Sequence, residues 1–360
     1  MPDTVTVAIP TLNAGPELAR TLDAVRAQRL ERRALQVLVC DSGSSDGTPV
    51  LAAARGAEVI TIPAERFSHG GTRNLLMSSA AGDHVAFLSQ DAVPASEHWL
   101  ERLLSAFELA ADVGLTFGPY LPRAEASLSV ARELTDWFAS LSPDGRPRID
   151  VLAPGLRDLP QRAFMGPLGF FTSANGCVAR AAWERVPFRD IAYAEDHMLA
   201  QDMLRAGFAK VFVPDAAVIH SHDYSPWQWL RRSFDEARAI REVYGWRVTV
   251  RDALRNVRGR ALADWRRARW PAELVAGGHP PQRPAEQALG ARGAGRPAQE
   301  AIGAQRPPWP PERLGGWRLE VLGAALIHHA ARGAGELLGA NADALPRRLV
   351  AHLSLERRAR

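Results

Sequence analysis

Apolar and polar residues form a repeated pattern over the first 120 residues. Each repeat has a short run rich in Val, Ile and Leu, then a turn-rich segment, then a run in which apolar residues have the spacing of a helix face. Continuous apolar runs of this length predict strands that are buried on both faces. The predicted strands are Thr4–Ile9, Leu35–Cys40, Glu58–Ile62, His84–Ser89 and Val113–Phe117. The predicted helices are Pro16–Ala27, Pro49–Ala54, Thr72–Ala80 and Glu97–Ala110. This alternation predicts an α/β fold with a mostly parallel sheet flanked by helices.

The second half of the chain continues this pattern and then becomes helical. The predicted elements are a strand at Phe170–Ala179, a helix from about His197 to Ala206, short strands at Lys210–Val213 and Ala217–His220, and a long helix from about Pro226 to Trp246. Strands therefore end near residue 220, and the only regular elements predicted beyond it are helices.

We expect four regions along the chain. Residues 1–225 form the α/β domain, and residues 226–270 form a helical extension. Residues 271–316 are rich in Pro, Gly, Ala and Arg, which indicates a linker that we expect to be disordered. Residues 317–360 form basic amphipathic helices, which either pack back on the body or lie on a surface.

The formal net charge of +4 hides an uneven distribution. Residues 1–225 hold 20 Lys and Arg against 27 Asp and Glu, whereas residues 226–360 hold 24 against 13. A basic region can contact a membrane surface or a nucleic acid, or it can simply be solvated. Since Lys210 is the only lysine, a compositional bias toward arginine explains part of this charge equally well.

Cysteine usage and the N-terminal sequence favour the cytoplasm. Cys40 and Cys177 lie in apolar runs and cannot form a disulfide framework, which favours buried reduced thiols. The N-terminus lacks the basic and apolar regions of a secretory signal. No apolar stretch reaches the length of about 18 residues that spans a bilayer, so we expect no membrane-spanning helix.

Polar clusters follow the first four predicted strands, in the segments 10–15 (PTLNAG), 41–48 (DSGSSDGT), 66–74 (RFSHGGTRN) and 90–92 (QDA). Open parallel sheets bind ligands at the carboxyl ends of their strands, so these clusters should share one edge. Neither G-x-G-x-x-G after the first strand nor G-x-x-x-x-G-K-[ST] occurs. The usual phosphate cradles of dinucleotide-binding and P-loop proteins are therefore missing from the sequence.

Two of these clusters carry candidate chemistry for a diphosphate. Asp91 is suited to a divalent cation that bridges a diphosphate, because magnesium usually takes one or two carboxylates plus phosphate oxygens. Gly70 and Gly71 would let the backbone approach a ligand, and Arg73 offers a forked cation suited to phosphate. A helix cap or a turn is the plain alternative for both clusters.

Two further segments carry acidic and imidazole groups. Glu195-Asp196 opens a predicted helix, where the helix dipole favours carboxylates, and one of them could act as a general base. His220-Ser221-His222 follows a strand, and in extended backbone its two imidazoles point the same way, with Ser221 opposite. The pair could approach one ion, although two histidines without a third ligand are equally compatible with a surface role.

In order and spacing, these segments resemble family-2 glycosyltransferases with the GT-A fold. The resemblance rests on Pro10-Thr11-Leu12-Asn13, the 41–48 segment, Asp91 and Glu195-Asp196. Three segments resemble the bacterial rhamnosyltransferase branch in particular: 67–74 (FSHGGTRN), 87–94 (FLSQDAVP) and 219–225 (IHSHDYS). The resemblance covers roughly residues 4 to 245 and, weakly, the C-terminal helices.

The resemblance implies a GT-A (Rossmann-like) domain with a helical C-terminal extension, a Mg²⁺ or Mn²⁺ cofactor and inversion at the anomeric carbon. Asp41 would bind the donor's base, and Asp91 would hold the cation in the place of the last Asp of the usual D-x-D. One of His220 and His222 would complete the metal site. Asp196 would be the general base, with Glu195 positioning the acceptor. The other implied donor-binding residues are Pro10, Thr11, Asn13, Ser42, Gly70, Gly71, Arg73 and Gln90.

The implied reaction moves L-rhamnose from dTDP-rhamnose to a hydroxyl of a cell-surface glycan or lipid-linked acceptor. The alternatives are another nucleotide sugar, such as a UDP- or GDP-hexose, or a non-catalytic nucleotide-sugar-binding module. A nucleotidyltransferase would carry a glycine-rich, lysine-containing loop after the first strand, and this chain has none there. No recognition motif supports a nucleic-acid partner.

The basic C-terminal helices predict a peripheral contact with the cytoplasmic face of the membrane. In this hypothesis arginines face anionic lipid while leucines bury or insert. The residues concerned are Arg231, Arg232, Arg238, Arg241, Arg347, Arg348, Leu337, Leu338 and Leu349. A solvated basic helix that packs on the catalytic body is an equally good interpretation.

Overall fold

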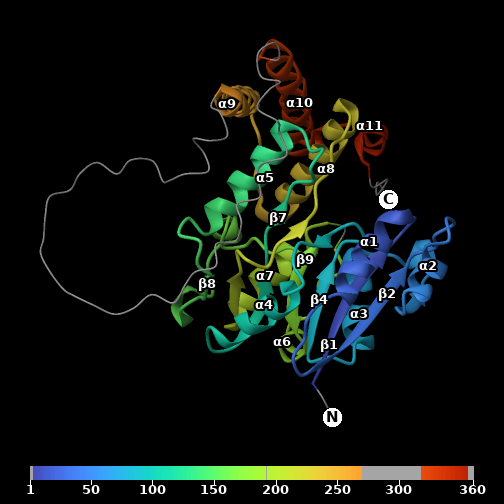
Figure 1. Cartoon of the computed structure of the whole chain (residues 1–360). Helices are drawn as coiled ribbons and strands as arrows, with labels where there is room; N and C mark the ends of the chain where they lie inside the picture. Colours follow the sequence, from blue (N-terminus) through green and yellow to red (C-terminus); the bar gives the residue numbers. More distant parts are fainter. Residues whose placement is uncertain (1–2, 192, 270–317, 356–360) are drawn as a thin grey trace, which may run out of the picture.

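The computed structural model describes residues 3–191, 193–269 and 318–355. The predicted linker 271–316 lies outside the described residues. Figure 1 shows an α/β body and a group of C-terminal helices placed beyond one edge of its sheet.

The main sheet has eight strands in the order β3-β2-β1-β4-β9-β6-β10-β8. Their bounds are Asp3–Thr11 (β1), Arg33–Asp41 (β2), Glu58–Thr61 (β3), His84–Leu88 (β4), Val113–Phe117 (β6), Arg148–Asp150 (β8), Asn175–Ala179 (β9) and Ala209–Phe212 (β10). The pairings within β3-β2-β1-β4 and between β6 and β10 are parallel, whereas β9 and β8 run antiparallel to their neighbours. The prediction of a mostly parallel sheet is confirmed.

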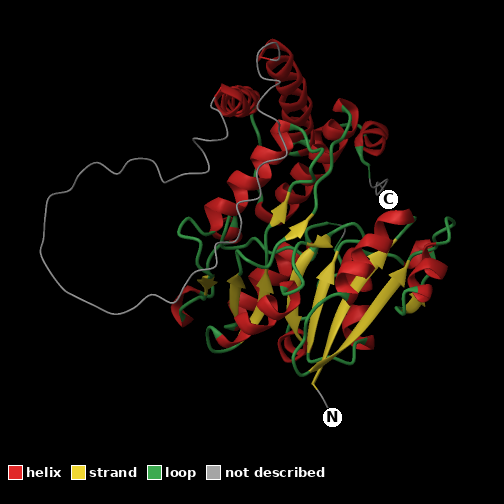
Figure 2. Ribbon diagram, viewed as in Figure 1, coloured by secondary structure: helices red, strands yellow, loops and turns green. Residues whose placement is uncertain are grey.

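Helices cover both faces of this sheet (Figure 2). Their bounds are Gly15–Arg26 (α1), Thr48–Ala54 (α2), His69–Ser79 (α3), Trp99–Ser105 (α4), Leu128–Leu141 (α5), Arg180–Arg185 (α6) and Glu195–Ala206 (α7). Short 3-10 turns lie at Ala64–Arg66, Ala106–Glu108, Pro154–Leu156, Gln161–Phe164 and Ala342–Ala344. Successive side chains of a strand point to opposite faces, so the sheet has two cores. Val7 of β1 packs with α1 and α4 on one face, and Ala8 packs with α3 and α7 on the other.

A second, small sheet lies between the body and the C-terminal helices. It consists of Val93–Pro94 (β5), Tyr120–Leu121 (β7) and Val218–Ile219 (β11), in the order β5-β11-β7. β11 is parallel to β7 and antiparallel to β5. The residues that precede β5 and those that follow β7 and β11 therefore emerge at the same end of this sheet.

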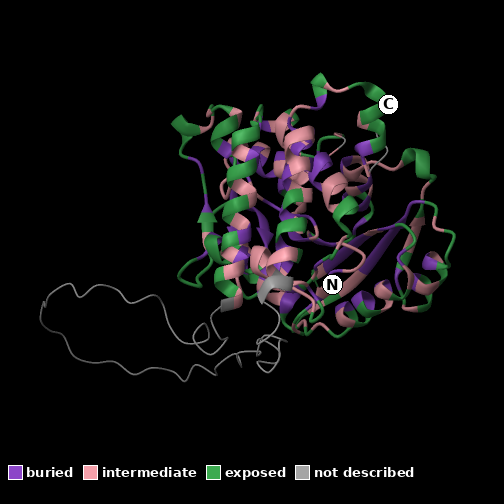
Figure 3. Ribbon diagram, turned by 90° about the horizontal axis from the view of Figure 1, so that it is seen from above, coloured by how far each residue is buried: buried purple, intermediate pink, exposed green. Residues whose placement is uncertain are grey.

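The C-terminal helices are Pro226–Tyr244 (α8), Val250–Arg269 (α9), Arg318–Gly339 (α10) and Arg347–Leu353 (α11). The predicted extension over 226–270 is two helices, because Gly245 adopts φ 69° and ends α8. α10 packs closely along α8. A Cβ on Gly335 would lie 2.2 Å from the carbonyl oxygen of Leu230, and one on Gly339 would lie 2.1 Å from that of Phe234. In Figure 3 buried residues line the inner faces of these helices as well as the sheet.

The structure corrects some predicted bounds. The predicted strand Phe170–Ala179 begins only at Asn175, and Phe170 and Phe171, which pack against Phe117, lie in the segment before it. α3 begins earlier than predicted because the Ser68 side chain caps it by accepting from the Gly71 amide. None of the described helices is long and apolar enough to cross a membrane.

Candidate active site

The loops after β1 and β2 are joined by a network of hydrogen bonds. Asp41 is buried, and its carboxylate accepts the amides of Gly43 (3.1 Å) and Ser44 (2.9 Å) and the hydroxyl of Thr11 (3.1 Å). Asn13 has φ 46°, and its side-chain oxygen accepts the amide of Ser45 at 2.9 Å. These bonds fix the shape of the predicted nucleotide pocket before a ligand enters.

The remaining residues predicted for this pocket belong to the same edge. Pro10 and Thr11 end β1, and the Ser42 hydroxyl donates to the Thr11 carbonyl oxygen at 2.9 Å. Gln90 holds the backbone of Leu12 at both ends: its Oε1 accepts the Leu12 amide at 2.9 Å and its Nε2 donates to the Leu12 carbonyl at 3.3 Å. A glutamine can make both bonds, whereas a carboxylate at position 90 could only accept.

Asp91, His220 and His222 lie together at the end of the small sheet. The Asp91 Oδ1 atom is 3.5 Å from His220 Nδ1, and Oδ2 is 3.4 Å from His222 Nε2. One ligand atom from each of the three residues lies within 4.8 Å of the others. Ser221 points away from this group and accepts the Arg123 amide at 3.0 Å, as the alternation of an extended backbone predicts.

The protonation of this group suits a divalent cation. Burial opposes ionisation of Asp91, but His220, His222 and Arg123 outweigh it and lower its pKa to about 2. Burial and the neighbouring His220 lower the pKa of His222, which favours the neutral imidazole that can ligate a cation. His220 Nδ1 is buried without a hydrogen-bond partner among the described residues. One carboxylate and two imidazoles, one with an unused nitrogen, fit a cation that completes its shell with diphosphate oxygens.

Arg123 is a further member of this group that the sequence analysis missed. Its guanidinium donates to Asp91 Oδ2 at 3.1 Å and binds both oxygens of Glu17 on α1 at 2.9 and 2.5 Å. No motif surrounds Arg123 in the sequence. The parallel pairing of β7 with β11 places it beside the two histidines.

The acidic pair at the start of α7 has two different environments. Glu195 is buried and forms a salt bridge of 2.9 Å with Arg73 of α3. Asp196 is only partly buried, and its Oδ2 accepts the Ser173 amide at 3.3 Å. Glu195 is therefore turned into the protein, while Asp196 is available at the edge of the sheet. Ala194 before them adopts φ 61°, a left-handed conformation that alanine rarely takes.

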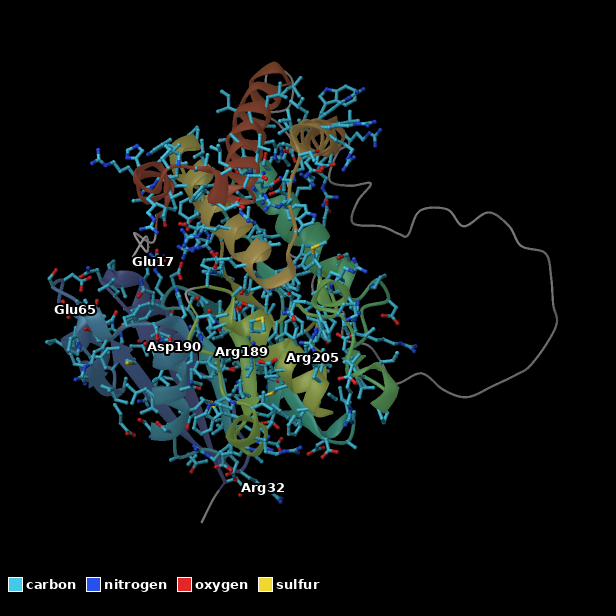
Figure 4. The ribbon with its side chains drawn as sticks, turned by 180° about the vertical axis from the view of Figure 1, so that it is seen from behind. Glu17, Arg32, Glu65, Arg189, Asp190 and Arg205 are labelled. Atoms are coloured by element: carbon cyan, nitrogen blue, oxygen red, sulfur yellow. The ribbon has the colours of Figure 1, made fainter. Side chains whose placement is uncertain are left out.

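The glycines of the 66–74 segment pack against protein. A Cβ on Gly70 would lie 2.0 Å from the Arg189 carbonyl oxygen, and one on Gly71 would lie 2.5 Å from the Ser68 hydroxyl. Figure 4 labels Arg189 and its neighbour Asp190 in the segment against which α3 packs. Close packing is thus a sufficient reason for both glycines, and their contact with a donor remains a prediction.

Tyr120 lies between the groups that contain Asp91 and Asp196. Its ring packs edge-on against the His220 ring with centroids 5.1 Å apart. Its hydroxyl is hydrogen-bonded to the Thr172 hydroxyl, one residue before the Ser173 amide that donates to Asp196. Asp91 and Asp196 therefore lie on the same side of the molecule, separated by one partly buried tyrosine and its neighbours.

A second cluster of one carboxylate and two histidines lies between α5, α9 and α10. It contains Glu133, His328 and His329, with ligand atoms again within 4.8 Å of one another. His329 is fully buried, and its Nε2 lies 2.6 Å from Asp264 Oδ2. Three guanidiniums surround Glu133, those of Arg132, Arg260 and Arg332. Arg132 also pairs with Asp264 and Arg260 with Glu336, so this network of ion pairs joins the three helices, and we interpret the cluster as a contact between helices.

Most of the arginines predicted to face lipid have partners within the protein. Arg231 donates to the Ser354 carbonyl oxygen, and Arg241 pairs with Asp343. Arg232 and Arg238 each pair with a glutamate one turn along α8, Glu236 and Glu242. Leu337 and Leu338 pack into small cores, whereas Arg347, Arg348 and Leu349 on α11 are exposed.

This fold and site define a class: an α/β protein with a preformed polar pocket, a candidate cation site and a carboxylate at the carboxyl edge of its sheet. Residues 6–130 match the model of the family described as glycosyl transferase family 2. An O-antigen chain rhamnosyltransferase, WbaN of Salmonella anatum, is 31% identical over 237 residues, which cover 64% of this chain and 70% of that protein. The chain belongs to family 2 of the glycosyltransferases, and the predicted GT-A fold is confirmed by this membership together with the observed sheet.

Other relatives are also named as rhamnosyltransferases. The O-antigen chain rhamnosyltransferase RfbN of Salmonella typhimurium is 29% identical over 64% of this chain and 70% of its own. An N-acetylglucosaminyl-diphospho-decaprenol L-rhamnosyltransferase of Mycobacterium tuberculosis is 26% identical over 62% of this chain and 78% of its own. Among solved structures, the mannosyltransferase PcManGT of Pyrobaculum calidifontis, in complex with GDP-Man and Mn²⁺, is 18% identical with a TM-score of 0.48, covering 98% of this chain and 80% of its own.

Proposed function

We propose that this protein is an inverting, metal-dependent rhamnosyltransferase. It would transfer L-rhamnose from dTDP-rhamnose to a hydroxyl of a cell-surface glycan or a lipid-linked acceptor at the cytoplasmic membrane face. The observation that carries this proposal is the placement of Asp91 with its two histidines and of Asp196 on either side of Tyr120. The two relatives named as O-antigen chain rhamnosyltransferases and the mycobacterial L-rhamnosyltransferase support the choice of sugar.

On the donor side, the residues after β1, β2 and β4 would bind the nucleotide. The hydrogen bonds of Asp41 and Asn13 hold the loops of the predicted nucleotide pocket rigid, so little conformational entropy is lost when the donor binds. Asp91, His220 and His222 would hold Mg²⁺ or Mn²⁺. The bound ion supplies electrostatic stabilisation of the departing nucleoside diphosphate.

On the acceptor side, Asp196 would take the proton of the attacking hydroxyl. A general base must lie within hydrogen-bond reach of that hydroxyl, and Asp196 is the partly exposed member of the acidic pair. The salt bridge of Arg73 with Glu195 would fix the first turn of α7 and so orient Asp196. Attack from the face opposite the leaving group inverts the anomeric configuration.

A donor panel with one substitution tests this proposal. Nucleoside diphosphate release is measured with dTDP-rhamnose, UDP-glucose, UDP-N-acetylglucosamine and GDP-mannose in Mg²⁺ or Mn²⁺. We expect dTDP-rhamnose to be preferred and Asp196→Asn to slow its acceptor-dependent turnover by about a hundredfold or more. The control is Asp158→Asn, which changes an exposed aspartate. Preference for a hexose would overturn the choice of sugar, and full activity of Asp196→Asn would overturn the assignment of the base.

A further inference from the structure

Arg123 shares an oxygen atom with the candidate cation site. Asp91 Oδ2 accepts a hydrogen bond from Arg123 Nη2 at 3.1 Å and lies 3.4 Å from His222 Nε2. A cation ligated by this oxygen would be a close neighbour of the guanidinium. Like charges at such short range repel each other unless an anion lies between them.

Arg123 is fixed in this place from three directions. Both oxygens of Glu17 accept from its guanidinium, the Asp91 carbonyl oxygen accepts from Nη2 at 3.2 Å, and its own amide donates to Ser221. Figure 4 places Glu17 on the side of the body that faces the C-terminal helices. A swing of the side chain away from an arriving cation would break the fork with Glu17.

The charged groups around Asp91 would need a further anion once a divalent cation is bound. Two carboxylates, those of Glu17 and Asp91, share the single guanidinium of Arg123. A divalent cation would leave the group with an excess of positive charge. The Arg123 Nε atom is also buried without a hydrogen-bond partner among the described residues. Guanidiniums bind phosphate oxygens in a fork geometry.

We propose that Arg123 is a second cationic contact for the diphosphate of the donor, held beside Asp91 by Glu17. The inference rests on the proposed function and adds a residue to it. Before the donor binds, the guanidinium opposes binding of the divalent cation at Asp91. When the diphosphate binds, it lies between the two positive charges and is held by both.

The proposal predicts shifts of opposite sign for two binding constants of Arg123→Gln. Mn²⁺ binding to the nucleotide-free protein, measured by electron paramagnetic resonance of free Mn²⁺, should tighten by about three- to tenfold because a like charge is removed. Binding of inorganic pyrophosphate in saturating Mn²⁺, measured by calorimetry, should weaken by about tenfold because a charge-assisted contact is lost. The control is Arg33→Gln, which removes the surface salt bridge with Glu101 and should move neither constant.

A merely structural role would give a different result. If Arg123 only supports Asp91, both constants weaken together in Arg123→Gln, and that outcome, or the absence of any change, overturns the proposal. Pyrophosphate carries neither sugar nor base, so these measurements do not depend on the donor being dTDP-rhamnose. Opposite shifts in a protein that turns over no nucleotide sugar would uphold the role of Arg123 and overturn the proposed function instead.

Glu17→Gln provides a second test if Arg123→Gln does not fold. The glutamine oxygen can still accept from Arg123, whose guanidinium keeps its two bonds to Asp91, and only a nearby negative charge is removed. We expect weaker Mn²⁺ binding and unchanged or tighter pyrophosphate binding. Loss of pyrophosphate binding in this variant would contradict the proposal.

Discussion

Two clusters in this protein have the same composition and opposite electrostatics. Each brings one carboxylate and two histidines within 4.8 Å, around Asp91 in one case and Glu133 in the other. Asp91 is bound by one guanidinium, which Glu17 also holds, whereas three guanidiniums surround Glu133. The number of candidate ligands therefore does not identify a metal site. A carboxylate already neutralised by arginines stabilises the fold and has little charge left to attract a cation.

The largest expected difference between the clusters is in activity. Asp91→Asn should slow glycosyl transfer by roughly a thousandfold, because the carboxylate that would hold the cation at the leaving group is lost. Glu133→Gln, the matched change in the second cluster, should retain transfer at temperatures where it stays folded. Nucleoside diphosphate release from both variants checks this, and equal losses in the two would remove the distinction.

Stability should respond in the reverse order. Glu133→Gln leaves Arg332 without its carboxylate between packed helices, although Arg260 keeps Glu336, and this should lower the free energy of unfolding by about 3 to 5 kcal/mol. Asp91→Asn should change it much less, because Arg123 keeps its fork with Glu17. Urea unfolding of both variants measures the two values, and a greater loss in Asp91→Asn would contradict the assignment of the second cluster as structural.

The contribution of Glu133 to stability should depend on pH. Burial opposes its ionisation, but His328 and the surrounding arginines outweigh it and lower its pKa to about 2 from an ordinary value of 4.5. A lowered pKa stabilises the folded state above pH 4.5, and this stabilisation is lost as the pH falls toward 2. The difference in unfolding free energy between the wild type and Glu133→Gln should shrink by roughly 3 kcal/mol over that interval. A difference that is constant down to pH 2.5 would show that the carboxylate is not held in its charged form.

A smaller effect on kcat is expected when the salt bridge between Arg73 and Glu195, which would orient Asp196, is broken. Arg73→Gln leaves Glu195 buried without its guanidinium and should lower kcat by about tenfold, with little change in the KM for the donor. The sequence analysis instead placed Arg73 near the diphosphate. A raised donor KM with unchanged kcat would favour that earlier interpretation over the positioning role.

The smallest effect concerns the remaining basic surface. If α11 contacts anionic lipid, Arg348→Gln should weaken binding to phosphatidylserine vesicles by about 1 kcal/mol, or roughly fivefold. The control is Arg146→Gln, which removes an exposed arginine of the body. Flotation at low salt measures both. Failure of the wild type to float would remove the predicted membrane contact.

The sequence predicts most of the main sheet, because most of its strands are continuous apolar runs, but it misses the three-residue strand β8. It misses β5 and β7, which have two residues each and gain their stability from pairing with β11. It also misses α5, although the run 128–141 has helical apolar spacing. Local patterns therefore fail for short strands that depend on a partner, and α5 shows that a helix with clear apolar spacing can also be missed.

The same division applies to the site. Asp91 and the two histidines could be predicted because each stands in a recognisable segment at a strand end. Arg123 stands in no motif, and only the pairing of β7 with β11 brings it to Asp91. Arg231 and Arg241 of α8 were expected to face lipid, but their partners, the Ser354 carbonyl oxygen and Asp343, lie far away in the sequence. Charge along a chain does not reveal which charges are neutralised in the fold.

Anomalous diffraction from crystals grown with Mn²⁺ and dTDP tests the central claim most directly, because it locates every bound ion in one experiment. The account predicts one manganese peak, between Asp91, His220 and His222, and no peak at Glu133. A peak at Glu133, or none at Asp91 with dTDP bound, would contradict it.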